Sequence, residues 1–391
     1  MRAVTIERVS EAVPPTARAA AIVELDAIRD NVARLHEASS TAQLMAVVKA
    51  DGYGHGLVPS ARAALAGGAT WLGTAALDEA LALRDAGIDV RVVSWLAAPG
   101  ERYADAIQAD VDVSVYAPWA LGEVSAAART VGSPARIHLK VDTGLARGGA
   151  WIEDWPALVD AALAAEAEGT VRVVGLWSHL AHADAPRHPT IDRQLATFRD
   201  ALELAEKAGV RPEVRHLANS AATLSLPDTH FDLVRPGVSV YGLSPGPDVG
   251  SSTELGLRPA MTLMARLAMV KRVPAGQGVS YGHRYVTSGE TTLGLVPLGY
   301  ADGIPRLASN VGPLWAAGRR RTIAGTVCMD QVVVDLEGDA AAVGDEVVLF
   351  GPGTAGEPTA DDWAAAVGTI NYEIVTRIGP RVPRIHRELS S

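Results

Sequence analysis

The fold is indicated most directly by residues 44–56, which read LMAVVKADGYGHG. The first five residues are all apolar, which is typical of a short strand that is buried on both faces. A lysine and a glycine-rich turn end this run, and the alanine- and leucine-rich residues 57–66 predict a helix. The sequence therefore predicts a strand, a polar turn and a helix in direct succession.

The same succession recurs over the next two hundred or so residues, in the manner of α/β proteins. Further apolar runs lie at 71–75, 90–95, 111–116, 136–141, 171–177, 214–217 and 231–234. Helical patterns are clearest at 57–66, 78–86, 118–130, 155–168 and 191–208. Eight strand-like runs with helices between most of them predict a (β/α)₈ TIM-type barrel. An open, doubly wound parallel sheet is the alternative.

The pattern changes after residue 244, where proline, glycine and serine gather at 245–252. Shorter and more alternating segments follow at 262–273, 292–296, 321–324, 331–336 and 346–350, and a helical pattern comes at 360–367. Such segments, separated by turn residues, predict a mainly β C-terminal domain. We expect a flexible N-terminal tail at 1–18, the barrel at 19–246 and the β-rich domain at 247–391.

Composition narrows the class of protein. The 391 residues include 48% hydrophobic residues, 35 Lys and Arg against 45 Asp and Glu, a net charge of −10, and one cysteine, Cys328. An acidic chain without a long basic block is a poor candidate for binding nucleic acid or an anionic membrane. We find no apolar run that predicts a transmembrane helix or a signal peptide, which favours a cytoplasmic location.

Polar residues gather where the predicted barrel strands end, and these ends carry the catalytic groups of TIM barrels. They include Lys49, Lys140, Arg147, His179, His216, Ser220, Arg235 and Gly237. A lysine that leaves a buried strand can have a lowered pKa and react with aldehydes. The alternative for Lys49 is a side chain that extends to solvent. His179, His182 and His188 match no known metal-ligand spacing, so we predict no metal site.

Residues 48–56, VKADGYGHG, resemble the pyridoxal-phosphate lysine motif of the bacterial alanine racemase family. Further matching motifs follow in the family's order at 216–221, 234–237, 241–242, 279–282, 299–303, 327–331 and 371–374. The resemblance extends from about Ile22 to His386. It implies a pyridoxal-phosphate-bearing barrel followed by a β-rich domain, which residues 19–24 join as a strand. It also implies a head-to-tail homodimer in which Tyr281 and Met329 serve the partner's site.

The resemblance also implies roles for individual residues. Lys49 would bond the cofactor and act as one of two bases at the substrate Cα, with Tyr281 as the other base on the opposite face. His179 would hydrogen-bond Tyr281. Arg235, supported by His216, would face the pyridine nitrogen of the cofactor, and its guanidinium does not give up a proton.

Binding roles follow from the same resemblance. The cofactor phosphate would be held by Tyr53, Ser220, the amides near Gly237 and Val238, and Tyr372. Arg147 would contact the phenolic oxygen of the cofactor and help to place the substrate carboxylate, which the amide of Met329 would also bind. Lys140 aligns with a position that can be carbamylated in the family. One departure stands out, because Thr326 occupies a position where many members have arginine.

The activity implied is the interconversion of L- and D-alanine by a two-base mechanism, which supplies D-alanine for peptidoglycan. A racemase of broader specificity, for example towards serine, is the first alternative. A decarboxylase of basic amino acids on the same scaffold and a non-catalytic carrier of the cofactor are more distant ones.

Overall fold

The computed structural model describes residues 17–387. These residues divide into two compact units. Residues 28–52 and 57–257 form the first, here called the barrel unit, and residues up to 27, 53–56 and from 258 onwards form the second, the β unit. The expected tail at 1–18 lies outside the described residues except for Ala17 and Arg18. The division after residue 257 falls later than the boundary at 246 that composition suggests.

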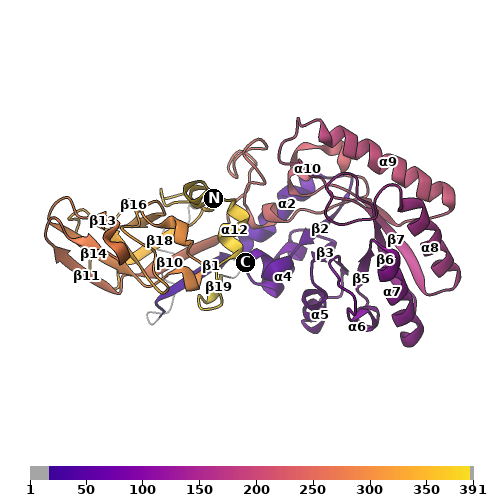
Figure 1. Cartoon of the computed structure of the whole chain (residues 1–391), viewed down its shortest axis with the longest axis horizontal. Helices are drawn as coiled ribbons and strands as arrows, with labels where there is room; N and C mark the ends of the chain where they lie inside the picture. The colour runs from indigo at the N-terminus through magenta and orange to yellow at the C-terminus, as the bar shows by residue number, and fades with distance from the viewer. Residues whose placement is uncertain (1–16, 388–391) are drawn as a thin grey trace. The chain divides into compact units, whose positions relative to one another are not determined.

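The barrel unit contains one eight-stranded sheet in the order β8-β7-β6-β5-β4-β3-β2-β9 (Figure 1). All neighbouring strands are parallel. The two strands at the ends of this order, β8 and β9, are linked by a hydrogen bond of 3.1 Å. The Asp232 N–H, just before β9, donates to the carbonyl of Arg215 in β8. The barrel prediction is therefore confirmed, and the open sheet is wrong. The strands are β2 (Gln43–Val47), β3 (Trp71–Thr74), β4 (Arg91–Ser94), β5 (Asp112–Val115), β6 (Ala135–Lys140), β7 (Val171–Trp177), β8 (Val214–His216) and β9 (Leu233–Val234).

Helices alternate with these strands. The five predicted helices are confirmed as α4 (Leu57–Ala66), α5 (Leu77–Asp85), α7 (Pro118–Val131), α8 (Trp155–Ala167) and α9 (Thr190–Ala208). Helix α9 buries residues three and four positions apart, such as Leu195, Phe198 and Leu202, which is the pattern of a helix lying on a core. The sequence did not predict α2 (Leu25–Ala38), α6 (Tyr103–Gln108) or α10 (Ser220–Ser225).

The β unit contains a six-stranded sheet in the order β16-β15-β18-β10-β1-β19, with two smaller sheets, β11-β14-β17 and β12-β13. Its elements are β1 (Ala19–Glu24), β10 (Met261–Arg266), β11 (Met269–Val273), β12 (Gly278–Val279), β13 (Tyr285–Val286), β14 (Thr291–Val296), β15 (Pro313–Ala316), β16 (Arg319–Thr322), β17 (Val332–Asp335), β18 (Glu346–Phe350), α11 (Ala360–Val367), α12 (Asn371–Thr376) and β19 (Arg384–Arg387). The mainly β character of this part is therefore confirmed.

One expected segment, 262–273, is two strands in different sheets. The chain changes partners at Leu267 and Ala268, whose N–H groups donate to Asp345 and Leu295 at 2.8 Å each. Because Leu267 is buried, the apolar run continues through the break and conceals it in the sequence.

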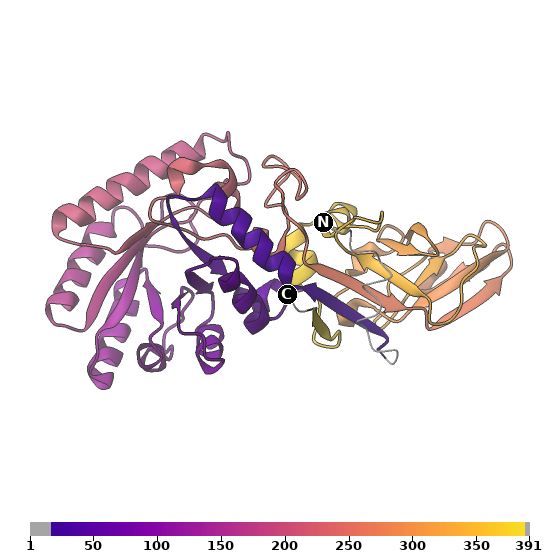
Figure 2. The ribbon, with the colours of Figure 1, turned by 180° about the vertical axis from the view of Figure 1, so that it is seen from behind.

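The first strand within residues 17–387, β1, lies inside the sheet of the β unit (Figure 2). Strand β1 pairs antiparallel with β10 and parallel with β19. Ile22 of β1 is fully buried and clusters with Ala20 and Met264. This sheet is therefore built from residues that lie on both sides of the barrel in sequence.

No helix within residues 17–387 is long and apolar enough to cross a membrane.

We predict that Ile22→Ala lowers the free energy of unfolding by about 2–5 kcal/mol, because it opens a cavity in a buried sheet. Urea unfolding followed by circular dichroism measures the change. Val343→Ala, at a side chain that is 65% exposed, is the control, and it is expected to change stability by no more than about 0.5 kcal/mol. Equal effects of the two substitutions would show that β1 contributes no core.

Candidate functional site

Lys49 follows β2 after one residue, Val48, and begins a left-handed turn, α3 (Lys49–Tyr53). Ala50 and Asp51 have φ/ψ values of 55°/50° and 53°/49°, a conformation that costs an L-residue about 1–2 kcal/mol. The Asp51 carboxylate accepts the Leu57 N–H at 2.8 Å and so ties the turn to the start of α4. A Cβ at Gly52 would lie 2.8 Å from the Ser60 hydroxyl oxygen. Strain of this kind concentrates at functional sites.

A second lysine, Lys140, ends β6 and is buried. Burial lowers its pKa to about 8, and the charges of Arg235 and Arg147 act in the same direction. Burial also lowers the pKa of Lys49, again with help from Arg147, while Glu79 opposes the shift. The cations therefore lie close enough to disfavour one another, and an anion would relieve this repulsion.

Asp142 lies between Lys140 and Arg147 in sequence, and the loop that follows β6 donates hydrogen bonds to it. Its oxygens accept the backbone N–H groups of residues 144–147 at 2.9–3.2 Å. The loop is thereby wrapped around a fixed negative charge, and the backbone of Arg147 is held by it. These hydrogen bonds position Arg147, whose side chain is exposed.

Arg235 lies just beyond β9 and is 5% exposed. It donates to the carbonyls of Ser178 (2.8 Å) and Leu217 (3.2 Å), and Nη1 lies 3.1 Å from Nδ1 of His216. Its guanidinium carbon lies 4.9 Å from the ring centre of Trp177, within the range of a cation–π interaction. Burial lowers its pKa to about 9, so the group remains charged at neutral pH.

A hydrogen-bonded relay runs from Arg235 through the barrel interior. His216 Nε2 lies 2.9 Å from His138 Nδ1, and His138 Nε2 lies 3.1 Å from the carboxylate of Asp112. His138 and Asp112 are fully buried. Burial, then the charge of Arg235, lowers the pKa of His216 far below its usual value, so His216 is neutral.

The two ends of the relay fix the protons within it. A guanidinium only donates, so it requires His216 Nδ1 to accept, and a carboxylate only accepts, so it requires His138 Nε2 to donate. Both imidazoles therefore carry their proton on Nε2, and every donor points from Arg235 towards Asp112. Burial would raise the pKa of Asp112, but the hydrogen bond from His138 and the hydrogen bond and charge of Arg91 outweigh it and lower the pKa.

Sequence reasoning missed the inner part of this arrangement. Asp112 and His138 lie inside apolar strand runs and Trp177 ends another, so they were counted as strand residues. A charged residue within a strand buried on both faces needs a partner, and that signal could have identified Asp112. Trp177 stacks on His216 with an interplanar angle of 5°, and Lys140 Nζ lies 4.4 Å from its ring centre.

Ser220 and Gly237, two of the expected phosphate ligands, lie together. The Gly237 N–H donates to the Ser220 hydroxyl oxygen at 2.8 Å. Ser220 is the first residue of α10, which Asn219 caps by accepting the Ala222 N–H. Val238 follows in the next short turn and is buried.

Four further expected site residues belong to the β unit, namely Tyr53, Tyr281, Met329 and Tyr372. The rings of Tyr53 and Tyr372 lie 6.4 Å apart, and burial, then Tyr372, raises the pKa of Tyr53. Residues 53–56 pack against α12, because a Cβ at Gly54 would lie 2.5 Å from the Val375 carbonyl oxygen. Tyr281 and Met329 are 74% and 53% exposed.

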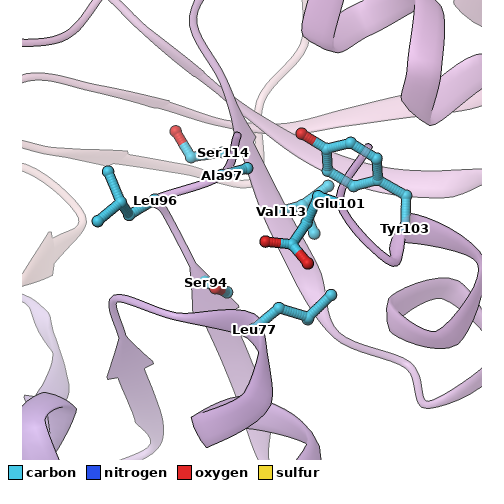
Figure 3. A pocket seen from close by; sticks show the side chains of 8 residues that line it. All are labelled: Leu77, Ser94, Leu96, Ala97, Glu101, Tyr103, Val113 and Ser114. Atoms are coloured by element: carbon cyan, nitrogen blue, oxygen red, sulfur yellow. The ribbon is translucent and has the colours of Figure 1, made fainter. Parts of the chain in front are cut away.

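A small pocket lies at the carboxyl ends of β4 and β5 (Figure 3). Its lining includes Leu77, Leu96, Glu101 and Tyr103. The pocket has room for about one water molecule. The Tyr103 hydroxyl is buried with no hydrogen-bond partner among residues 17–387, and such a water would satisfy it. The pocket is therefore too small for a substrate or a cofactor.

The charged residues at the carboxyl ends of the barrel strands fit pyridoxal phosphate. The cations Lys49, Lys140, Arg147 and Arg235 suit a phosphate and a carboxylate. The lowered pKa of Lys49 suits reaction with an aldehyde. Arg235, a donor that stays protonated, suits an unprotonated ring nitrogen.

Comparison with known proteins gives a consistent result. The model of the alanine racemase N-terminal domain matches residues 23–245, and that of the C-terminal domain matches residues 260–386. The chain is 66% identical to the alanine racemase of Frankia casuarinae, over 94% of this chain and 96% of that protein. It is 62% identical to that of Streptomyces coelicolor, over the same shares.

Solved structures agree. The alanine racemase from D-cycloserine-producing Streptomyces lavendulae superposes with a TM-score of 0.95 at 60% identity, over 97% of this chain and 98% of that one. The alanine racemase of Bacillus anthracis with bound L-Ala-P superposes with a TM-score of 0.86 at 34% identity, over 96% of each chain.

We predict that Asp112→Asn lowers the free energy of unfolding at pH 7 by roughly 3–5 kcal/mol, because the fully buried carboxylate is the shared partner of Arg91, Arg136 and His138. Asp110→Asn is the matched control. Asp110 also pairs with Arg136, but it is 68% exposed, so its loss is expected to cost at most about 1 kcal/mol. Urea unfolding measures both.

The pH dependence provides a second check on Asp112. Its folded-state pKa is lowered, so its contribution is present above the unfolded pKa of about 3.9 and is lost as pH falls through the folded value. The difference between wild type and Asp112→Asn should therefore shrink in acid. A difference that stays constant down to pH 2 would contradict the assignment.

Proposed function

Because the chain belongs to the alanine racemase family, we propose that it interconverts L- and D-alanine with pyridoxal phosphate as its cofactor. The observation that carries the proposal is the cluster of Lys49, Lys140, Arg147 and Arg235 at the carboxyl ends of the barrel strands. The product D-alanine would serve peptidoglycan synthesis in the cytoplasm.

Lys49 would bond the aldehyde, and Arg235 would donate to the ring nitrogen. The phosphate would be held by Tyr53, Ser220, the amides of Gly237 and Val238, and Tyr372. When bound, pyridoxal phosphate withdraws electrons from the substrate Cα and acidifies its hydrogen.

Two residues would move the α-proton. The lowered pKa of Lys49 increases the fraction of uncharged amine, which can accept the α-proton on one face of the substrate. Tyr281 would act on the other face. His179 Nδ1 lies 3.4 Å from Nη2 of Arg235, which only donates, so the proton of neutral His179 lies on Nε2. From there it can donate to a phenolate and stabilise it.

Substrate carboxylate binding would fall to Arg147 and the amide of Met329. The Asp142 carboxylate holds the backbone of Arg147 in place. Lys140 supports the cluster, and its pKa of about 8 leaves an appreciable share of uncharged amine, the form that takes up carbon dioxide. Carbamylation of Lys140 stays a prediction.

We also propose a homodimer in which a second copy of the chain supplies Tyr281 and Met329. Several large apolar side chains of the β unit are exposed, and such surface favours association. Besides Tyr281 and Met329 they include Tyr300, Leu307, Val311 and Ile370. Tyr300 and Met329 lie on adjoining turns, because the Tyr300 N–H donates to Cys328 and the Ala301 N–H donates to Met329.

The first test is a coupled assay for D-alanine formed from L-alanine, with and without added pyridoxal phosphate. We expect Lys49→Ala to remove both the activity and the long-wavelength absorbance of bound cofactor. Lys207→Ala, at an exposed lysine paired with Glu203, should retain both. Racemisation that persists in Lys49→Ala would refute the mechanism, and a faster reaction with L-serine would refute the substrate.

Mixing two inactive variants tests the shared site. Lys49→Ala and Tyr281→Phe should each be inactive alone. If the chains exchange at random, half of the dimers are mixed and each has one intact site, so about a quarter of wild-type activity should return. No recovery after verified exchange of subunits would show that each chain uses its own Tyr281.

A further inference from the structure

Tyr281 lies in a turn whose backbone is unusual. The turn joins β12 to β13, and Ser280 has φ 61° and ψ −171°. His283 also has a positive φ, of 45°. Two non-glycine residues in such conformations need support from their surroundings. The phenol itself is largely exposed, so its direction depends on how this backbone is held.

Thr326 supports the turn from a neighbouring segment. Its hydroxyl donates to the Tyr281 carbonyl at 2.8 Å. Its own carbonyl accepts the Ser280 hydroxyl at 2.7 Å. The side chain is 4% exposed, and a β-branched residue has few rotamers. One buried residue therefore makes hydrogen bonds to both residues of the strained step.

The segment around Thr326 is itself fixed. A Cβ at Gly325 would lie 2.7 Å from the Val279 carbonyl oxygen, so the two segments are in direct contact. The Gly325 N–H donates to the Asn310 side chain at 2.6 Å, and that side chain donates to the Arg284 carbonyl at 3.0 Å. The segment that carries Thr326 is thus held by its own packing and hydrogen bonds.

We propose that Thr326 is a positioning residue for Tyr281, and that its two hydrogen bonds hold the backbone from which the phenol reaches the substrate Cα. The proposal rests on the proposed function. Thr326 stands where many family members have arginine, and this proposal assigns it a role in orienting Tyr281, one of the two bases. Thr326 touches neither substrate nor cofactor in this role.

The role predicts an asymmetric defect. In deuterium oxide, Lys49 can remove and return a hydrogen on its own face, which exchanges one enantiomer without inverting it. Inversion needs Tyr281. If the phenol is misplaced, that enantiomer should exchange more often for each inversion, while the other enantiomer should exchange and invert more slowly.

The experiment compares Thr326→Val with wild type in the holoenzyme, using proton NMR to follow α-hydrogen exchange and inversion of each enantiomer separately. Valine keeps the shape and removes the hydroxyl. We expect the ratio of exchange to inversion to rise about tenfold for one enantiomer, the effect of about one hydrogen bond. Thr326→Ser, which keeps the hydroxyl, should return the ratio towards the wild-type value.

Thr229→Val is the matched control, because it removes an equally buried hydroxyl that donates to the Leu226 carbonyl at 2.7 Å in the barrel unit. It should leave the ratio unchanged. A wild-type ratio in Thr326→Val, or equal slowing of both enantiomers there, would overturn the proposal.

Hydrogen exchange followed by mass spectrometry gives a readout that is independent of activity. Deuterium uptake in the peptide covering residues 278–286 should be faster in Thr326→Val than in wild type or in Thr229→Val. If wild type exchanges neither enantiomer, the proposed function fails, and the peptide measurement still decides whether Thr326 holds the turn. Unchanged uptake would overturn the positioning role.

Discussion

The candidate site depends on how one buried positive charge is balanced. Arg235 is enclosed in the barrel, and its contacts within residues 17–387 are carbonyls, imidazoles and the face of Trp177. Desolvating a guanidinium in this way is costly unless an anion compensates it. Asp112 lies at the far end of a relay through two neutral histidines, and it shares its charge with Arg91 and Arg136, which it pairs directly. A carboxylate in direct contact with Arg235 would compete with a ligand for its donors, and the relay avoids this.

The same reasoning explains why the cations of the site stay reactive. Lys49 and Lys140 have lowered pKa values because they are buried among other positive groups. The charge of Asp142 offsets part of this shift at Lys140, while the amides of its own loop occupy its oxygens. Of these two carboxylates, Asp112 thus lies in the barrel interior and Asp142 in a loop. The surplus positive charge is left for an anionic ligand.

Much of the fold could be predicted from the sequence, because parallel barrel strands are apolar throughout and polar residues follow each of them. The small strands β12, β13 and β15 could not, because two to four residues carry too little pattern. The relay was missed because its partners are far apart, 26 residues between Asp112 and His138 and 78 between His138 and His216. Thr326 was noticed as a departure, but its contact with Tyr281, 45 residues away, needed the structure.

The place of β1 has a consequence for the order in which the chain can fold. Its partners β10 and β19 begin at residues 261 and 384, so a ribosome synthesises the whole barrel and most of the β unit before the sheet around β1 can be completed. Until then the apolar residues of β1 lack their neighbours, and an unpaired strand of this kind can associate with other chains. Pairing between such distant segments also slows folding. The β unit is therefore expected to complete its folding last. Before that point it is the part of the chain that most needs protection by chaperones.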